Sequence, residues 1–221
     1  MAKETWGRTA YVAGPVCMGA YGLIRLIDEE RGPGPAWTLG HLALLAGVVL
    51  FVPVFLGLDA RAAYGRGAAA RWFAATGLAL GLLGVAAVTV QAGIDLLVGS
   101  HAEDRAAMNA LFERIQSHPG VKPAFYTVGP LLFYVGLMLL VGQLAVQRAT
   151  AAWRPPAVVA GVAVTAASLD LIPVGALLFL LALAPLRDMP EGGTSGGGTP
   201  GGDGSGGRAL RTVRPAPRRT G

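Results

Sequence analysis

Charged residues and cysteine are both scarce in this chain of 221 residues. Only 14% of its residues are charged, whereas a soluble globular domain carries about 25%. The single cysteine, Cys17, lies inside an apolar stretch and has no partner within the chain, which excludes an internal disulfide framework. We expect Cys17 to be a small apolar side chain rather than a reactive thiol. Hydrophobic residues, in contrast, make up 53% of the sequence.

Motifs of nucleotide binding and hydrolysis are also missing. The sequence has no phosphate-binding GxxxxGK[ST] loop, no dinucleotide fingerprint behind a strand, no GxSxG nucleophile elbow and no HExxH metal-binding spacing. Ligation of haem would need axial histidines on facing helices, and His41 is the one histidine within an apolar stretch. We therefore expect no metal, no cofactor and no enzymatic activity.

Long apolar runs fill more than half of the sequence. They cover residues 9–27, 37–58, 72–98, 124–147 and 156–186. A bilayer core of about 30 Å needs about 20 helical residues, and each run reaches or nearly reaches that length with few charges inside. Because helices satisfy their own backbone groups in lipid, the sequence predicts an all-α polytopic transmembrane bundle in the lipid bilayer.

The first apolar run allows another interpretation, a secretory signal peptide, because Lys3 and Arg8 precede about fifteen uncharged residues. No clean small-residue cleavage pattern follows the run. Arg25 and the acidic residues 28–30 follow instead. We interpret the run as an uncleaved first membrane helix, with Arg25 extending to the interface.

The number of crossings depends on residues 156–186, which are too long for one crossing as a single helix. Proline suits the first turn of a helix and disfavours helical conformation in the residue before it. Pro156 and Pro173 therefore predict two shorter helices, 156–169 and 173–186, and six crossings in all. A single helix over 156–186 is the alternative and gives five.

Basic residues test the two arrangements, since short cytoplasmic loops collect Lys and Arg. Six crossings with the N-terminus inside place eight basic residues on the inner side and five on the outer side, and the five arginines of the C-terminal tail join the inner set. The inner set is Lys3, Arg8, Arg61, Arg66, Arg71, Arg148, Arg154 and Arg187, and the outer set is Arg25, Arg31, Arg105, Arg114 and Lys122. Five crossings give a smaller excess. We predict six helices in the cytoplasmic membrane, with both termini cytoplasmic.

One loop and the C-terminal region have characters of their own. The outer segment 99–123 predicts an amphipathic helix, because Met108, Leu111, Phe112 and Ile115 recur at helical spacing and Ser100 and Glu103 have the spacing of a capping box. Packing at the interface is its plain interpretation, and a lid over an outward cavity is the functional one. The chain thus divides into a membrane domain, 1–187, and a tail, 188–221.

The tail is predicted to be disordered, because its glycine-rich part cannot bury enough apolar area to offset chain entropy. Its five arginines suit anionic lipid. We expect no nucleic-acid binding, because no aromatic residues alternate with these arginines.

Small residues predict where helices approach closely. Gly77 and Gly81 form a GxxxG motif that Gly84 extends, and Gly129 and Gly136 lie seven residues apart. Such motifs serve packing within one chain or dimerisation, and we favour packing within the chain.

Polar residues inside the apolar runs are costly and therefore mark candidate functional positions. They are His41, Gln91, Asp95, Gln143 and Asp170. On the six-crossing arrangement all except Gln143 lie near the outer ends of their helices. A site of His41, Gln91, Asp95 and Asp170 would bind a divalent cation or pass a proton. In the alternative, the two carboxylates mark helix ends while His41 and Gln91 hydrogen-bond to neighbouring helices.

Three runs carry a resemblance. They are GIDLLVGS at 93–100, GPLLFYVG at 129–136 and DLIPVG at 170–175, and they resemble segments of uncharacterised multi-helix integral membrane proteins of actinobacteria. The resemblance covers the helical region and implies no activity or site residues. We expect a non-catalytic accessory or scaffold component with a protein partner. The alternatives are a small transporter or proton-coupled permease built around Asp95, His41 and Asp170, and an intramembrane enzyme.

Overall fold

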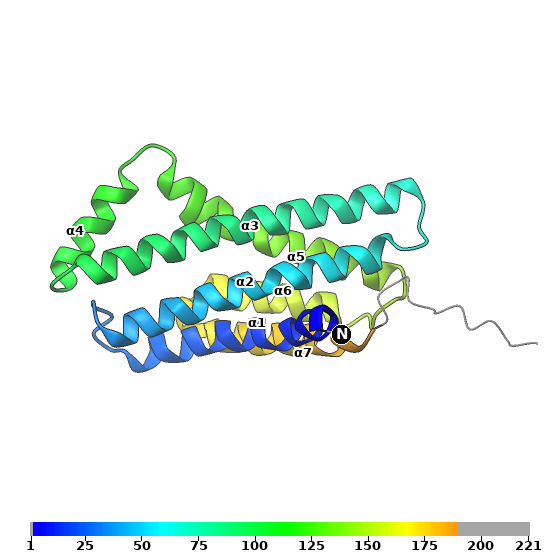
Figure 1. Ribbon diagram of the computed structural model, residues 1–221, viewed down its shortest axis with the longest axis horizontal. Coiled ribbons are helices and arrows are strands. Elements are labelled where there is room, and N and C mark those ends of the chain that lie inside the picture. Colours follow the sequence, from blue (N-terminus) through cyan, green and yellow to red (C-terminus); the bar gives the residue numbers. More distant parts are fainter. Residues whose placement is uncertain (1, 190–221) are drawn as a thin grey trace, which may run out of the picture.

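The computed structural model describes residues 2–189, with side chains from residue 7 onward. These residues form helices and no strand, which confirms the predicted all-α bundle (Figure 1). The α-helices are α1 (Ala2–Ile27), α2 (Pro35–Ala63), α3 (Ala68–His101), α4 (Arg105–Gln116), α5 (Gly129–Val146), α6 (Arg154–Ala167) and α7 (Ile172–Leu183). The π-helix η1 (Lys122–Val128) leads into α5, and the 3-10 helices η2 (Leu169–Leu171) and η3 (Ala184–Asp188) flank α7. The tail from residue 190 onward, with its predicted disorder and lipid contacts, lies outside the described residues.

Five helical segments are long and apolar enough to cross a membrane. They are Gly7–Ile27, Pro35–Ala63, Ala68–His101, Lys122–Val146 and Leu169–Asp188. The remaining segment, α6, has 14 residues and spans about 21 Å, which is less than the hydrocarbon thickness of about 30 Å. The described chain therefore contains five helices of membrane-spanning length and one shorter apolar helix.

The predicted break near Pro173 is present. Ser168 has an extended backbone with φ −158°, and its hydroxyl accepts a hydrogen bond from the backbone N–H of Asp170 at 3.2 Å. Pro173 then lies in the first turn of α7, as Pro155 and Pro156 lie in the first turn of α6. Gly161 and Gly175 face each other across the pair, so α6 and α7 pack together as a hairpin rather than as one long helix.

The first three helices, α1, α2 and α3, are longer than the apolar runs that predicted them. The run 37–58 lies within α2, which begins at Pro35 and continues to Ala63, and α3 likewise extends beyond 72–98 at both ends. Hydrophobicity indicates only the part of a helix that suits lipid. The backbone stays helical until turn residues such as Gly65, with φ 63°, end it.

Consecutive long helices run in opposite directions, so their connections gather at two ends of the bundle (Figure 1). We name these the N-terminal end, with residues 8, 61–71, 147–154 and 187–189, and the α4 end, with residues 25–41, 95–126 and 168–171. At the N-terminal end, Arg61 donates from Nη2 to the Met189 carbonyl at 3.1 Å. At the α4 end, Arg105 donates from Nη1 to the Glu30 carbonyl at 2.9 Å. The first and last described residues thus share one end.

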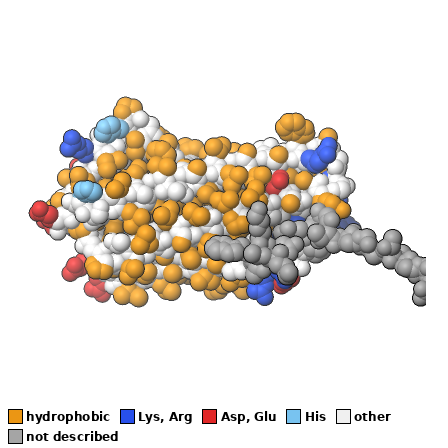
Figure 2. Space-filling model, in the orientation of Figure 1, with side chains coloured by type: hydrophobic (Ala, Val, Ile, Leu, Met, Phe, Trp, Pro, Cys, Tyr) orange, Lys and Arg blue, Asp and Glu red, His pale blue; other side chains and the backbone are white. Residues whose placement is uncertain are grey.

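The surface between the two ends is apolar, as lipid requires. Figure 2 shows hydrophobic side chains over the middle of the visible face and charged side chains toward the two ends. Leu83 is 58% exposed, Leu177 54% and Val49 50%, which would be costly in water. Exposure of large apolar side chains around a core that is itself apolar is expected of helices in a membrane.

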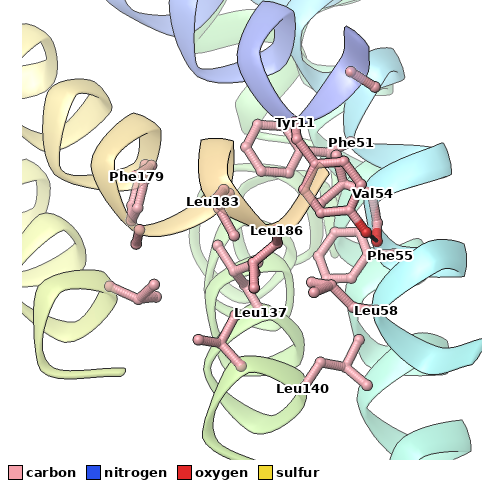
Figure 3. Close-up of a cluster of buried hydrophobic side chains, with 14 of the residues drawn as sticks. Tyr11, Phe51, Val54, Phe55, Leu58, Leu137, Leu140, Phe179, Leu183 and Leu186 are labelled. Atoms are coloured by element: carbon pink, nitrogen blue, oxygen red, sulfur yellow. Dashed lines mark hydrogen bonds between the residues drawn. The ribbon is translucent and has the colours of Figure 1, made fainter. Parts of the chain in front are cut away.

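The core combines aromatic and aliphatic side chains from α1, α2, α5, α7 and η3 (Figure 3). Phe133 of α5 packs edge-on against Phe51 and Phe55 of α2, with ring centroids 4.9 and 5.4 Å apart. Tyr134 stacks on Phe179 of α7 at 6.0 Å. These contacts join both sides of the bundle in one apolar centre.

The glycine motifs predicted to mediate packing within the chain do so. A side chain on Gly136 of α5 would place its Cβ 2.6 Å from the Gly77 carbonyl oxygen, and one on Gly84 of α3 would overlap the backbone of Phe133. Because backbone atoms cannot move aside, α3 and α5 reach this distance only with glycine at these positions.

The amphipathic segment forms α4, but its predicted capping box is wrong. Ser100 lies inside α3, where its hydroxyl donates to the Leu97 carbonyl at 2.9 Å. Asp104 is the N-cap of α4 instead and accepts a hydrogen bond from the Ala107 N–H at 2.7 Å. The long α3 extends past the predicted start and displaces the cap by four residues. Met108, on the apolar face of α4, is 2% exposed.

Candidate functional site

His41 and Asp95 meet at the α4 end, although 54 residues separate them in sequence. His41 Nε2, on α2, lies 3.6 Å from Asp95 Oδ2, on α3. The two residues are 4% and 6% exposed, so both are enclosed by protein. A histidine and a carboxylate this deeply buried are expected only where they satisfy one another. The sequence identified both residues, and the structure places them in contact.

Tyr126 completes this cluster from η1. Its hydroxyl donates a hydrogen bond to Asp95 Oδ1 at 2.9 Å. The π-helix leads directly into α5, and such segments are frequent at functional sites. Tyr126 was not among the predicted site residues, because a tyrosine near a helix end looks like an ordinary interfacial residue and nothing in the sequence signals a π-helix.

Trp37 links the cluster to α4. Its indole Nε1 donates to the backbone carbonyl of Asp95 at 2.9 Å, and its own carbonyl lies 2.8 Å from His41 Nδ1. The Trp37 and His41 ring centroids are 4.1 Å apart. The ring of Phe112, on α4, lies 6.1 Å from that of Trp37. Tyr21 of α1 packs edge-on against His41 at 5.3 Å. Two aromatic rings, those of Trp37 and Tyr21, therefore pack against the imidazole.

Asp170 does not join His41 and Asp95, so the prediction of one site containing all these residues is wrong for Asp170. Its Oδ1 lies 2.9 Å from Nη2 of Arg31 and 3.6 Å from Nε of Arg25. Arg31 has a φ of 48°, in the left-handed region, where the chain turns from α1 to α2. The Asp170 side chain is 45% exposed. Its two arginines neutralise it at the surface, while Asp95 is buried.

Gln91 and Gln143 do not join the cluster through any hydrogen bond of the described residues. Gln91 lies one turn from Asp95 on α3, but its Oε1 is buried and makes no hydrogen bond within the described chain. Gln143 donates from Nε2 to the Ala70 carbonyl at 2.8 Å, near the N-terminal end. A shared helix face was thus not sufficient to bring Gln91 into the network.

A small cavity adjoins His41. It has a volume of about 20 Å³, enough for about one water molecule. Its lining includes His41 and Trp37 of α2, Tyr21 and Arg25 of α1, and Arg31 of the connecting turn. The cavity therefore lies between the buried His41 and the partly exposed Arg25 and Arg31, which pair with Asp170.

Metal ligands do not converge in the part of the chain that the structure describes. Over residues 2–189 no group of three or more His, Cys, Asp or Glu side chains could hold a metal ion. His101 and His118 are exposed and face the Leu97 and Arg114 carbonyls, at 2.8 and 3.0 Å. What the cluster can do chemically is hold and exchange a proton between an imidazole and a carboxyl group.

Comparisons with known proteins give no relative from which to transfer a role. The chain matches no protein-family model, no curated protein and no solved structure.

Proposed function

We propose that this protein is an accessory or scaffold component of the cytoplasmic membrane, with no catalytic site of its own. Its five long apolar helices support a membrane protein. The observation that carries the proposal is the filled middle of the bundle, where rings of Phe51, Phe55 and Phe133 interlock. A protein built this way offers rigid outer faces to lipid and to a protein partner.

The filled middle favours this role over a permease. Transporters bind substrate near the bilayer midplane, at broken helices whose polar backbone lines a cavity. Here α3 and α5 are in backbone contact at mid-length, and the buried His41–Asp95 pair lies at one end. The permease alternative also needed Asp170, which pairs with Arg25 and Arg31 instead. One observation still favours it as second candidate, namely the proton-binding chemistry of His41 and Asp95.

Flux measurements separate the two candidates. We expect the purified chain in sealed liposomes carrying a pH-sensitive dye to leak protons no faster than empty liposomes, with or without a salt gradient. A rate well above the empty control that Asp95→Asn abolishes, and that the exposed-carboxylate control Glu113→Gln does not, would establish the permease and reject the scaffold.

Native purification tests the scaffold directly. We expect the tagged chain, extracted gently from its own membranes, to elute with a companion at a fixed molar ratio that persists through a second column. Elution of the chain alone at the mass of one or more copies of itself would reject an accessory role.

We further propose that the N-terminal end faces the cytoplasm. Seven described basic residues lie at that end and five at the α4 end, in the direction that the positive-inside preference requires. In a Cys17→Ser background, a membrane-impermeant maleimide should label His118→Cys on intact cells. It should label Arg66→Cys only after permeabilisation. The opposite pattern would reverse the orientation.

A further inference from the structure

The hydrogen bonds of His41 define where its protons are. His41 Nδ1 lies 2.8 Å from the Trp37 carbonyl oxygen, which can only accept a hydrogen bond. Nδ1 must therefore carry a hydrogen. The protonation state of the ring then depends on Nε2 alone, and Nε2 faces Asp95 Oδ2 at 3.6 Å.

The contact between Nε2 and the carboxylate requires one more proton. If His41 were neutral and Asp95 ionised, a nitrogen lone pair would face oxygen lone pairs, and a carboxylate would be buried without a cation. A proton on Nε2 removes both problems. Tyr126 donates a hydrogen bond to the other carboxyl oxygen, Oδ1, which leaves Oδ2 to face Nε2 of His41. Nε2 of His41 and Oδ2 of Asp95 thus hold a single exchangeable proton between them.

Other charged and titratable groups around His41 come from three neighbouring elements. Tyr21 and Arg25 belong to α1, Asp28 and Arg31 to the turn after α1, and Tyr126 to η1. Helix α4 contributes the apolar Phe112 here, which packs on Trp37. The guanidinium of Arg31 pairs with Asp170 at 2.9 Å, and its backbone N–H donates to Oδ1 of Asp28 at 3.3 Å. Arg25 is the cation that opposes a positive charge on His41, and the contact with Asp170 partly neutralises Arg25.

The small cavity gives the proton a route from one side only. It holds about 20 Å³, enough for about one water, and lies between His41 and the partly exposed Arg25 and Arg31. Arg25 Nε is buried and makes no hydrogen bond within the described chain, which leaves a donor for a water. Toward the N-terminal end, α2 continues with the buried side chains of Val48 and Phe51. No polar path leads from the pair in that direction through the described core.

We propose that His41 and Asp95 form a one-sided proton-binding site that exchanges with the aqueous phase at the α4 end and fastens α2 to α3 and η1 when occupied. A hydronium ion in the cavity transfers a proton to the lone pair of Nε2 and becomes water. In the reverse step, the imidazolium returns the proton to water and becomes a neutral imidazole. Without the proton, the attraction between His41 and Asp95 disappears, and the hydrogen bond from Trp37 to the Asp95 carbonyl remains between α2 and α3. The site responds to pH on one face of the membrane and moves nothing across it.

Trp37 reports the state of His41 directly. A charged imidazole stacked on an indole quenches its fluorescence more than a neutral one, and these two rings lie 4.1 Å apart. In a variant with Trp6, Trp72 and Trp153 replaced by Phe, the emission of Trp37 should rise about twofold or more through a single transition between about pH 4 and about pH 9. His41→Gln should abolish the transition, and Asp95→Asn should displace its midpoint by about one pH unit or more.

The matched control replaces the two exposed histidines. His101→Gln combined with His118→Gln should leave the transition unchanged, because neither residue contacts Trp37. Loss of the transition in that double variant, its persistence in His41→Gln, or its absence in the parent protein would each overturn the proposal. The double variant alters only exposed side chains, so this arm remains decisive even if His41→Gln fails to fold.

The side from which the proton exchanges is measured in sealed liposomes. Labelling of His118→Cys by a membrane-impermeant maleimide gives the orientation of the protein in these liposomes. A rapid pH change in the compartment at the α4 end should change Trp37 emission, while the same change in the other compartment should not. A response to the compartment at the N-terminal end would overturn the one-sided access.

Discussion

In the middle of the bundle, α3 and α5 approach until Gly136 lies against the backbone of Gly77 and Gly81, whereas at the α4 end the helices are joined by side chains. His41, Asp95 and Tyr126 there come from α2, α3 and η1. The difference teaches that the two regions depend on different variables. Packing in the middle depends on the shape of apolar surfaces, while the α4 end also contains charged and hydrogen-bonded side chains, through which we expect pH and salt to act.

The largest effect is expected from a single methyl group in the middle. Gly136→Ala places a Cβ into the backbone of α3, so we expect a loss of about 3 kcal/mol in the free energy of unfolding, or failure to fold. Gly142→Ala is the matched control on the same helix, because nothing lies within 4 Å of its Cβ. Denaturation in detergent micelles measures both. Equal stability of the two variants would contradict the close approach of α3 and α5.

The next largest effect is expected from Trp37→Ala at the α4 end. It removes the hydrogen bond to the Asp95 carbonyl and the contacts with His41 and Phe112, at a cost of about 2 kcal/mol. Backbone hydrogen exchange should rise in α4 and not in the middle of α3. Trp72→Ala, at a site 75% exposed, is the control and should cost little. Equal changes along the whole of α3 would show that the two regions are not separable.

A smaller effect is expected from Tyr126→Phe, which removes only a hydroxyl. The lost hydrogen bond to Asp95 should cost about 1 kcal/mol, since hydrogen bonds between membrane helices are worth little more. Tyr64→Phe, on an exposed side chain, serves as the control. A melting temperature of Tyr126→Phe equal to that of the parent would indicate that η1 is positioned by packing alone.

The smallest effect is expected from Asp170→Asn, and it should depend on salt. Asp170 is half exposed, so its pairs with Arg25 and Arg31 should contribute at most about 1 kcal/mol at low ionic strength. Raising the salt concentration should reduce the difference in melting temperature between variant and parent. A difference that salt leaves unchanged would mean that Asp170 acts through packing rather than through charge.

Sequence reasoning was most successful where lipid imposes a strong pattern. The apolar runs predicted the all-helical bundle, Pro173 predicted the division of the last run, and the GxxxG motif at Gly77 and Gly81 predicted a close helix approach. Each signal is local, because it depends on chain length, backbone conformation or the absence of a side chain. The exact helix ends were not predicted, since α1, α2 and α3 extend beyond the lipid-compatible run.

The candidate site was only partly visible in the sequence. His41 and Asp95 were singled out because polar groups in apolar runs are costly, but their contact depends on how α2 and α3 are aligned. Asp170 had the same signal and pairs with Arg25 and Arg31 instead. Unusual residues can be found from one helix at a time, whereas pairing is a property of two helices together.

By itself, the sequence determined that the chain forms apolar helices and where they turn, because hydrophobic length, proline and glycine act within a few residues of the chain. Tertiary structure alone decided that Tyr126 joins His41 and Asp95 while Gln91 and Asp170 do not. That selection depends on the rotation of α2, α3 and η1 about their axes. Packing between helices fixes the rotation, and no local sequence signal records it.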